Sequence, residues 1–71
     1  MNAYRLYRVE KGLNEVSGTF LTLGEAKQTK SSRVEVWKSC ATAILDVDAL
    51  ETVVVVDDYV IVYRIKKEKI S

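Results

Sequence analysis

Residues 52–65 constrain the fold of this chain more than any other part of the sequence. They form two runs of β-branched and aromatic residues, 52–56 and 59–65, separated by Asp57 and Asp58. Such residues favour strands, and two polar residues between two such runs are typical of a tight hairpin turn. Because both runs are apolar on both faces, we expect these strands in the middle of a sheet, covered or self-associated.

The first third of the sequence predicts a second hairpin. Residues 3–9 are rich in aromatic and β-favouring types, and residues 16–21 are the expected return strand. Gly12 and Asn14 favour a turn between them, with a loop of about four or five residues. Gly18 inside the return strand predicts a β-bulge.

A short helix is expected after this hairpin. Thr22 and Glu25 have the spacing of a capping box, in which the hydroxyl accepts from a backbone amide and the carboxylate reaches back. The helix should therefore begin at Leu23. Few apolar residues follow, so we expect it to end at Ser31 and Ser32.

Residues 33–39 alternate between polar and apolar types, which predicts a middle strand. An alternative is one amphipathic helix over residues 33–46, because Val34 and Trp37 begin a series of apolar residues at helical spacing. The β-branched start of the segment favours the strand. Residues 41–45 are then a further short strand or an extended crossing.

Two segments near the C-terminal hairpin are polar. Residues 46–51 form a connector, in which residues 48–51 can make one capped helical turn. Residues 66–71 are expected to fray.

Together these segments predict one small α+β domain spanning residues 1–71. We expect an antiparallel sheet built from a β-hairpin, a middle strand and a C-terminal β-hairpin, with the short helix as a single layer over the sheet. A chain of 71 residues leaves no room for a second domain. It also buries a small core, and one cysteine cannot close an internal disulfide, so a homodimer is expected to add stability.

Charge is segregated along the chain although the formal net charge is only +1. Residues 39–58 contain five acidic residues and no basic residue, whereas both flanking segments are basic. This pattern favours charge-complementary packing of the chain on itself or on a second copy. The balanced total gives no general attraction to nucleic acid or to an anionic membrane.

The sequence also predicts a location. It has no secretory signal pattern and no apolar run near the ~20 residues that a membrane helix needs. A single cysteine fits a reducing compartment. We therefore expect a cytoplasmic protein with no membrane partner.

The residue types argue against catalysis and cofactor binding. With 0 histidines, the chain has no serine–histidine, cysteine–histidine or histidine–metal arrangement of its own. Cys40 has no evident base, and the acidic residues near Asp46 and Asp48 lack the spacing and the glycine of a calcium loop. We expect no catalytic residue, no cofactor and no metal site.

Trp37 is the first candidate for a binding residue. In the predicted middle strand it lies beside Arg33 and Glu35, on a charged face. Aromatic residues and arginine dominate the binding energy of protein interfaces. The interpretation is a protein-interaction surface made of Trp37, Arg33 and Glu35. The competing interpretation is that the short helix covers the ring.

A second candidate surface is aromatic and basic, which suits single-stranded nucleic acid because bases stack on rings and phosphates meet cations. Its residues are Tyr4, Arg5, Tyr7, Arg8, Tyr63, Arg64 and Lys66. In ordinary sheets such residues pack as cross-strand partners, and no glycine-rich phosphate loop or RNA-binding signature accompanies them.

The sequence thus favours a small non-enzymatic protein-interaction domain that binds a larger protein or a copy of itself. An accessory or inhibitory protein of the phage or mobile-element type fits by analogy with chains of this size. A nucleic-acid-binding module that uses the tyrosine and arginine residues is the alternative.

Overall fold

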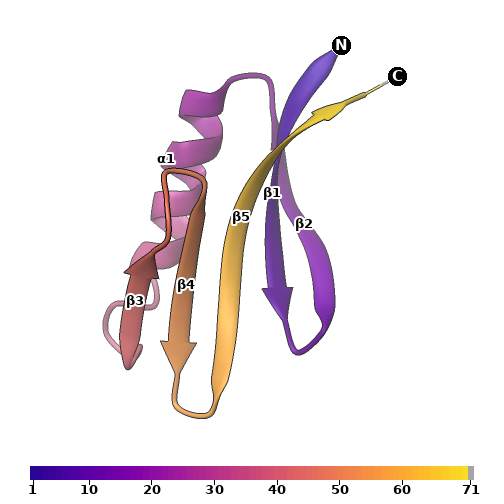
Figure 1. Cartoon of the computed structure of the whole chain (residues 1–71). Coiled ribbons are helices and arrows are strands. Elements are labelled where there is room, and N and C mark those ends of the chain that lie inside the picture. The colour runs from indigo at the N-terminus through magenta and orange to yellow at the C-terminus, as the bar shows by residue number, and fades with distance from the viewer. Residues whose placement is uncertain (71) are drawn as a thin grey trace.

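The two hairpins predicted from the sequence form, and they lie side by side in one antiparallel sheet (Figure 1). A computed structural model describes residues 1–70 as a small α+β fold with five strands and one helix. The elements in chain order are β1 (Asn2–Glu10), β2 (Leu13–Phe20), α1 (Leu23–Glu35), β3 (Ala43–Asp46), β4 (Glu51–Val56) and β5 (Tyr59–Lys69). The strand order is β2-β1-β5-β4-β3, which makes β5 the central strand.

The N-terminal hairpin is tighter than expected. Its turn contains only Lys11 and Gly12, both with positive φ (49° and 81°), and pairing begins at once between Glu10 and Leu13. A two-residue turn with positive φ at both positions matches the right-handed twist of the flanking strands. The predicted loop of four or five residues is therefore wrong.

The bulge predicted at Gly18 is confirmed. Leu6 pairs with Gly18 but Tyr7 pairs with Val16, so one extra residue lies in β2. A Cβ atom at Gly18 would come within 2.6 Å of the ring of Phe20. Glycine therefore allows the ring to fold back over the bulge.

The helix begins at Leu23 as predicted. The backbone amide of Glu25 donates to the hydroxyl of Thr22 at 3.2 Å, and this hydroxyl donates to the carboxylate of Glu25 at 2.9 Å. The carboxylate of Glu25 thus accepts from the Thr22 hydroxyl, whereas the capping-box pattern predicted that it would accept from the Thr22 backbone amide. Both bonds fix the first turn of the helix.

The helix is longer than predicted, and the predicted strand over residues 33–39 is wrong. The alternative of one helix over 33–46 is also wrong, because the helix ends at Glu35 and residues 43–46 form β3. Ala26, Lys30 and Val34 are buried at every fourth position, on one face of the helix. Burial of this face outweighs the weak strand preference of the valines.

The C-terminal hairpin is confirmed, with Asp57 and Asp58 as its turn. Two neighbouring expectations fail. No helical turn forms over residues 48–51, because the side chain of Asp48 accepts from the amide of Leu50 at 2.7 Å and β4 begins at Glu51. The segment from residue 66 to Lys69 does not fray, because it belongs to β5 and pairs with β1. Ser71 lies outside the described residues.

The core lies between α1 and one face of the sheet. Its buried members are Leu6, Ala26, Val34, Val54, Val56, Ile61, Tyr63 and Ile65. One charged side chain enters this region: the ammonium of Lys30 donates to Thr52 at 2.6 Å, and Thr52 donates to Asp46 at 2.8 Å. This chain of hydrogen bonds satisfies the buried polar groups between the helix and β3.

Leu6 lies at the centre of this core and is fully buried. Leu6→Ala should lower the free energy of unfolding by about 2–5 kcal/mol, because a cavity replaces its side chain. Urea unfolding followed by circular dichroism measures this. Leu21→Ala is the matched control, because Leu21 is 67% exposed and its truncation should change stability little. Equal effects of the two substitutions would contradict this core.

Candidate interaction surfaces

The sheet presents one face to α1 and one away from it. Because successive side chains of a strand point to opposite faces, the residues between the core positions lie on the other side. We call that side the open face. The register pairs Val9 with Val62 and Val62 with Val53, so these three valines form a row across β1, β5 and β4.

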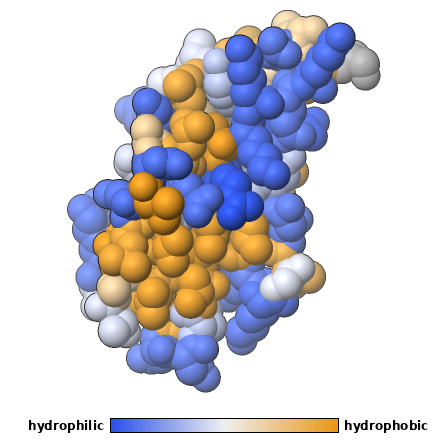
Figure 2. Space-filling view, viewed as in Figure 1, coloured by the Kyte–Doolittle hydropathy of each residue, from blue (hydrophilic) through white to orange (hydrophobic). Residues whose placement is uncertain are grey.

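One part of the open face is apolar. We call this part the apolar zone, and its residues are Val9, Leu45, Val53, Val55, Val60 and Val62. Leu45 is 56% exposed and Val60 is 45% exposed, and the others are half-buried by their neighbours. Figure 2, viewed as in Figure 1, shows a continuous hydrophobic area over β3, β4 and the lower part of β5. A contiguous exposed apolar patch bordered by polar residues is typical of an interaction site.

A second part of the open face contains charged side chains of both signs. We call it the charged zone, and its residues are Arg5, Tyr7, Glu51, Arg64, Lys66 and Glu68.

Side chains within the charged zone contact one another. The guanidinium of Arg64 pairs with the carboxylate of Glu51 at 2.7 Å. The hydroxyl of Tyr7 donates to Glu68, and the ammonium of Lys66 lies 5.9 Å from the centre of the Tyr7 ring. The cations of this zone are thus partly matched by groups of the same chain.

The structure divides the predicted nucleic-acid surface between two faces. Arg5 pairs with Lys66 and Tyr7 pairs with Arg64 in the register of β1 and β5, so these four side chains share the open face. The other three, Tyr4, Arg8 and Tyr63, lie on the face that packs against α1. Tyr63 is only 3% exposed.

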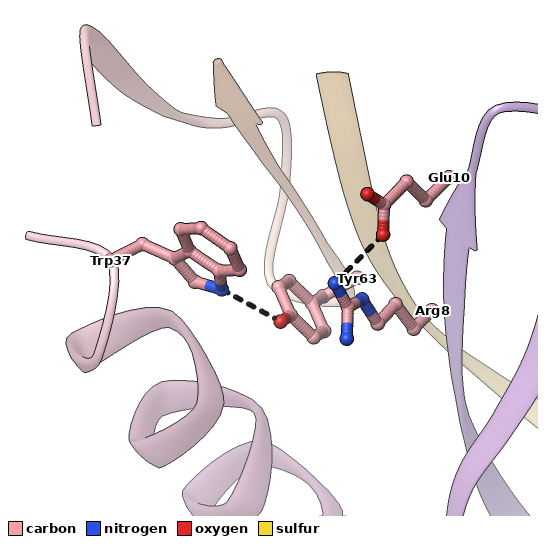
Figure 3. A network of polar contacts seen from close by, with 4 residues as sticks. All are labelled: Arg8, Glu10, Trp37 and Tyr63. Carbon is pink, nitrogen blue, oxygen red and sulfur yellow. Dashed lines mark hydrogen bonds and ion pairs between the residues drawn. The ribbon is translucent and has the colours of Figure 1, made fainter. Parts of the chain in front are cut away.

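Trp37 follows the end of α1 and turns back toward the sheet (Figure 3). Its indole Nε1 donates to the hydroxyl of Tyr63 at 3.0 Å. The guanidinium of Arg8 lies 5.9 Å from the indole ring centre and pairs with Glu10 at 2.7 Å. The ring is half-buried against the core cluster, so the helix end, the turn and β5 are joined through this residue.

The predicted trio of Trp37, Arg33 and Glu35 does not share a strand face. Arg33 and Glu35 belong to the last turn of α1, and Trp37 lies in the turn that follows. Arg33 donates to Ser17 of β2 at 3.2 Å, and Glu35 pairs with Lys38 at 2.7 Å. The geometric reason given for this interface is therefore wrong, and its role in binding stays a prediction.

The sequence predicted that residues 52–65 need cover or self-association, but it did not identify the open face as a set of site residues. The signal was present, because residues 52–65 are apolar on both faces and one short helix can cover only one of them. It also missed the buried Lys30, whose alkyl stem takes a core position of α1 while its ammonium bonds Thr52. A surface cavity of about 180 Å³ lies beside Lys30 and Asp46.

Tyr63→Phe removes the acceptor for the indole of Trp37. We expect a loss of about 1 kcal/mol in the free energy of unfolding and a shift of the Trp37 fluorescence emission, because a half-buried donor loses its partner. Urea unfolding and emission spectra measure both effects. The control is Tyr59→Phe, in a ring at the edge of the same core cluster that does not bond the indole. If the two variants behave alike, the indole bond contributes nothing.

The pKa of Tyr7 is raised from its ordinary value of 10.0, first because its hydroxyl donates to the carboxylate of Glu68. The folded state therefore favours neutral Tyr7, and this contribution is present below pH 10.0 and lost as pH rises through the higher folded pKa. Glu68→Gln should lower the pKa of Tyr7. The difference between ultraviolet titrations of wild type and variant measures the shift, and superimposable curves would exclude the Tyr7–Glu68 bond.

Three further searches gave negative results. Within residues 1–70, no group of three or more histidine, cysteine or acidic side chains is placed to bind a metal ion. In the same part of the chain, α1 is too short and too polar to cross a membrane. Comparisons with family models, curated proteins and solved structures found no match to this chain.

Proposed function

We propose that this chain is a non-enzymatic protein-interaction domain and that the open face is its docking surface. In this proposal α1 is a single layer over the opposite face and leaves the open face free. The observation that supports it best is the apolar zone, in which the row Val9, Val62 and Val53 lies uncovered by any described element. The domain would act as an accessory or inhibitory protein by occupying the surface of its partner.

The composition of the open face suits a protein partner. Protein interfaces combine an apolar centre with a polar rim, and the charged zone borders the apolar zone on the same strands. Both charge signs are present in that rim, with Glu51 beside Arg64. Such a rim favours a partner with a mixed surface over a uniformly charged polymer.

Trp37 is less suited to anchor the partner than expected from the sequence. Its indole donor is bonded to Tyr63 and its ring is half-buried, so little of it is free for contact. Hot-spot residues supply binding energy by burying surface that is exposed before binding. We therefore propose the open face as the docking surface, in place of Trp37, Arg33 and Glu35.

Binding of single-stranded nucleic acid is the second candidate. The observation in its favour is that Arg5, Tyr7, Arg64 and Lys66 come together on the open face. The contacts of this group weaken the case, because Lys66 lies over the Tyr7 ring on which a base would stack and Glu51 neutralises Arg64. We therefore favour the protein partner.

A photo-crosslinking side chain at position 62, in the middle of the apolar zone, tests the proposal in native cells. We expect protein adducts from position 62, whether with a second copy or with another protein. The same group at Gln28, an exposed position on α1, is the control and should give few adducts. Equal adduct yields at both positions would contradict docking through the open face.

The nucleic-acid alternative has its own readout. Purified protein is titrated with a labelled single-stranded oligonucleotide at ~50 and ~200 mM salt, because phosphate contacts weaken steeply over this range. We expect no binding that depends on Arg5 and Lys66. Salt-sensitive binding that is lost in Arg5→Ala and Lys66→Ala would favour the nucleic-acid function instead.

A further inference from the structure

We propose that the partner of the open face is a second copy of this chain, packed face to face about a two-fold axis parallel to β5. This inference rests on the proposed function, since it names the partner of the same surface. The product is a two-sheet dimer with the apolar zones in its centre and an α1 helix on each outer side.

The arrangement of the apolar zone is self-complementary. Val62 lies on the central strand, with Val9 at the same register on one side and Val53 on the other. A two-fold axis through the row at Val62 exchanges the two sides of the sheet. Val9 of each copy then meets Val53 of the other, and the two Val62 side chains meet at the axis, so the three valines face valines. At the ends of the row, Asn14 of each copy faces Leu45 of the other.

The charged zone is complementary under the same axis. Tyr7, Arg64 and Glu51 form the next row, across β1, β5 and β4. Exchange of the two sides brings Glu51 of one copy over β1 of the other, where Tyr7 and Arg5 lie. The two Arg64 side chains approach the axis, and each is already paired with Glu51 of its own chain. On each side of the axis Glu51 of one copy therefore faces Tyr7 of the other, and the basic Arg5 lies next along the same face of β1.

The available area is close to the smallest that a stable dimer needs. Five strands spaced about 4.8 Å apart, over about seven residues of about 3.3 Å each, give a face of about 550 Å². The pair would bury about 1,100 Å² before the relief of the side chains is counted, which is just below the lower end of specific protein interfaces at about 1,200 Å². The apolar zone alone would not reach this value, so the charged zone must also be covered.

The size of the chain favours a copy of itself as the partner. The core on the α1 side contains eight buried hydrophobic residues, a small number for an independent fold. The six apolar side chains of the apolar zone contribute little to a monomer, because they stay in contact with water. Packing two open faces together would convert them into a second core shared by both copies, at the usual sheet separation of about 10 Å.

The first test is the molar mass of the purified chain, measured by sedimentation equilibrium from about 1 to about 200 µM, where an interface of this size should dissociate. We expect the mass to rise to that of two chains. Val62→Lys should give the mass of one chain throughout. Val36→Lys is the matched control, since Val36 is 73% exposed and lies outside the sheet, and it should remain dimeric. Circular dichroism establishes that both variants are folded.

The second test uses charge reversal, which does not depend on the valine row. Glu51→Lys and Arg5→Glu should each weaken dimerisation at least about tenfold, because each places like charges across both copies of the contact. A mixture of the two variants should form a heterodimer that is tighter than either variant alone, because both contacts between positions 51 and 5 across the axis are then opposite in charge. Neither variant alone can place opposite charges at both contacts.

The outcomes separate this inference from the proposed function. A wild-type mass of one chain up to about 200 µM overturns the dimer. Adducts at position 62 with a different protein would then still support docking through the open face. A dimer that persists in Val62→Lys, or a mixture that fails to restore association, overturns the face-to-face geometry.

Discussion

The pairing of β5 with both β1 and β4 is the interaction on which the rest of the structure depends. It joins the first and last strands of the chain and places β5 at the centre of the sheet, where its backbone groups bond on both sides. Alternation along β5 then defines both faces. Ile61, Tyr63 and Ile65 enter the core against α1, whereas Val62 and Arg64 face away from it. One strand thus determines both the core and the open face.

Much of the fold could be predicted from the sequence because several signals were local. Two strands around Asp57 and Asp58, a bulge at Gly18 and a helix cap at Thr22 each depend on residues close in sequence. The segment over residues 33–39 could not be predicted in this way. Its valines favour a strand, but Val34 completes a buried helical face with residues far away on the sheet. Tertiary packing decided this segment, and local preference was too weak to oppose it.

The candidate sites were harder to predict than the fold, because they depend on which face α1 covers. Tyr7 and Tyr63 are each followed by an arginine in a predicted strand. Tyr7 nevertheless lies on the open face, whereas Tyr63 is buried beneath the end of the helix. The predicted position of Trp37 was wrong for the same reason. A residue expected on a charged strand face instead lies in a turn, and its indole bonds Tyr63. The spacing of apolar residues along the chain does not predict which face of the sheet the helix packs against.

The edges of the sheet favour association through its face. An exposed edge strand can pair with another chain, but β2 is interrupted by the bulge at Gly18 and β3 has only four residues. Both features hinder edge-to-edge pairing, so we expect association not through the sheet edges but through the apolar zone. If two copies meet there, dimerisation and folding share the same buried valines. The stability of the fold would then rise with protein concentration, because the valines of the open face would add to the small core of each copy.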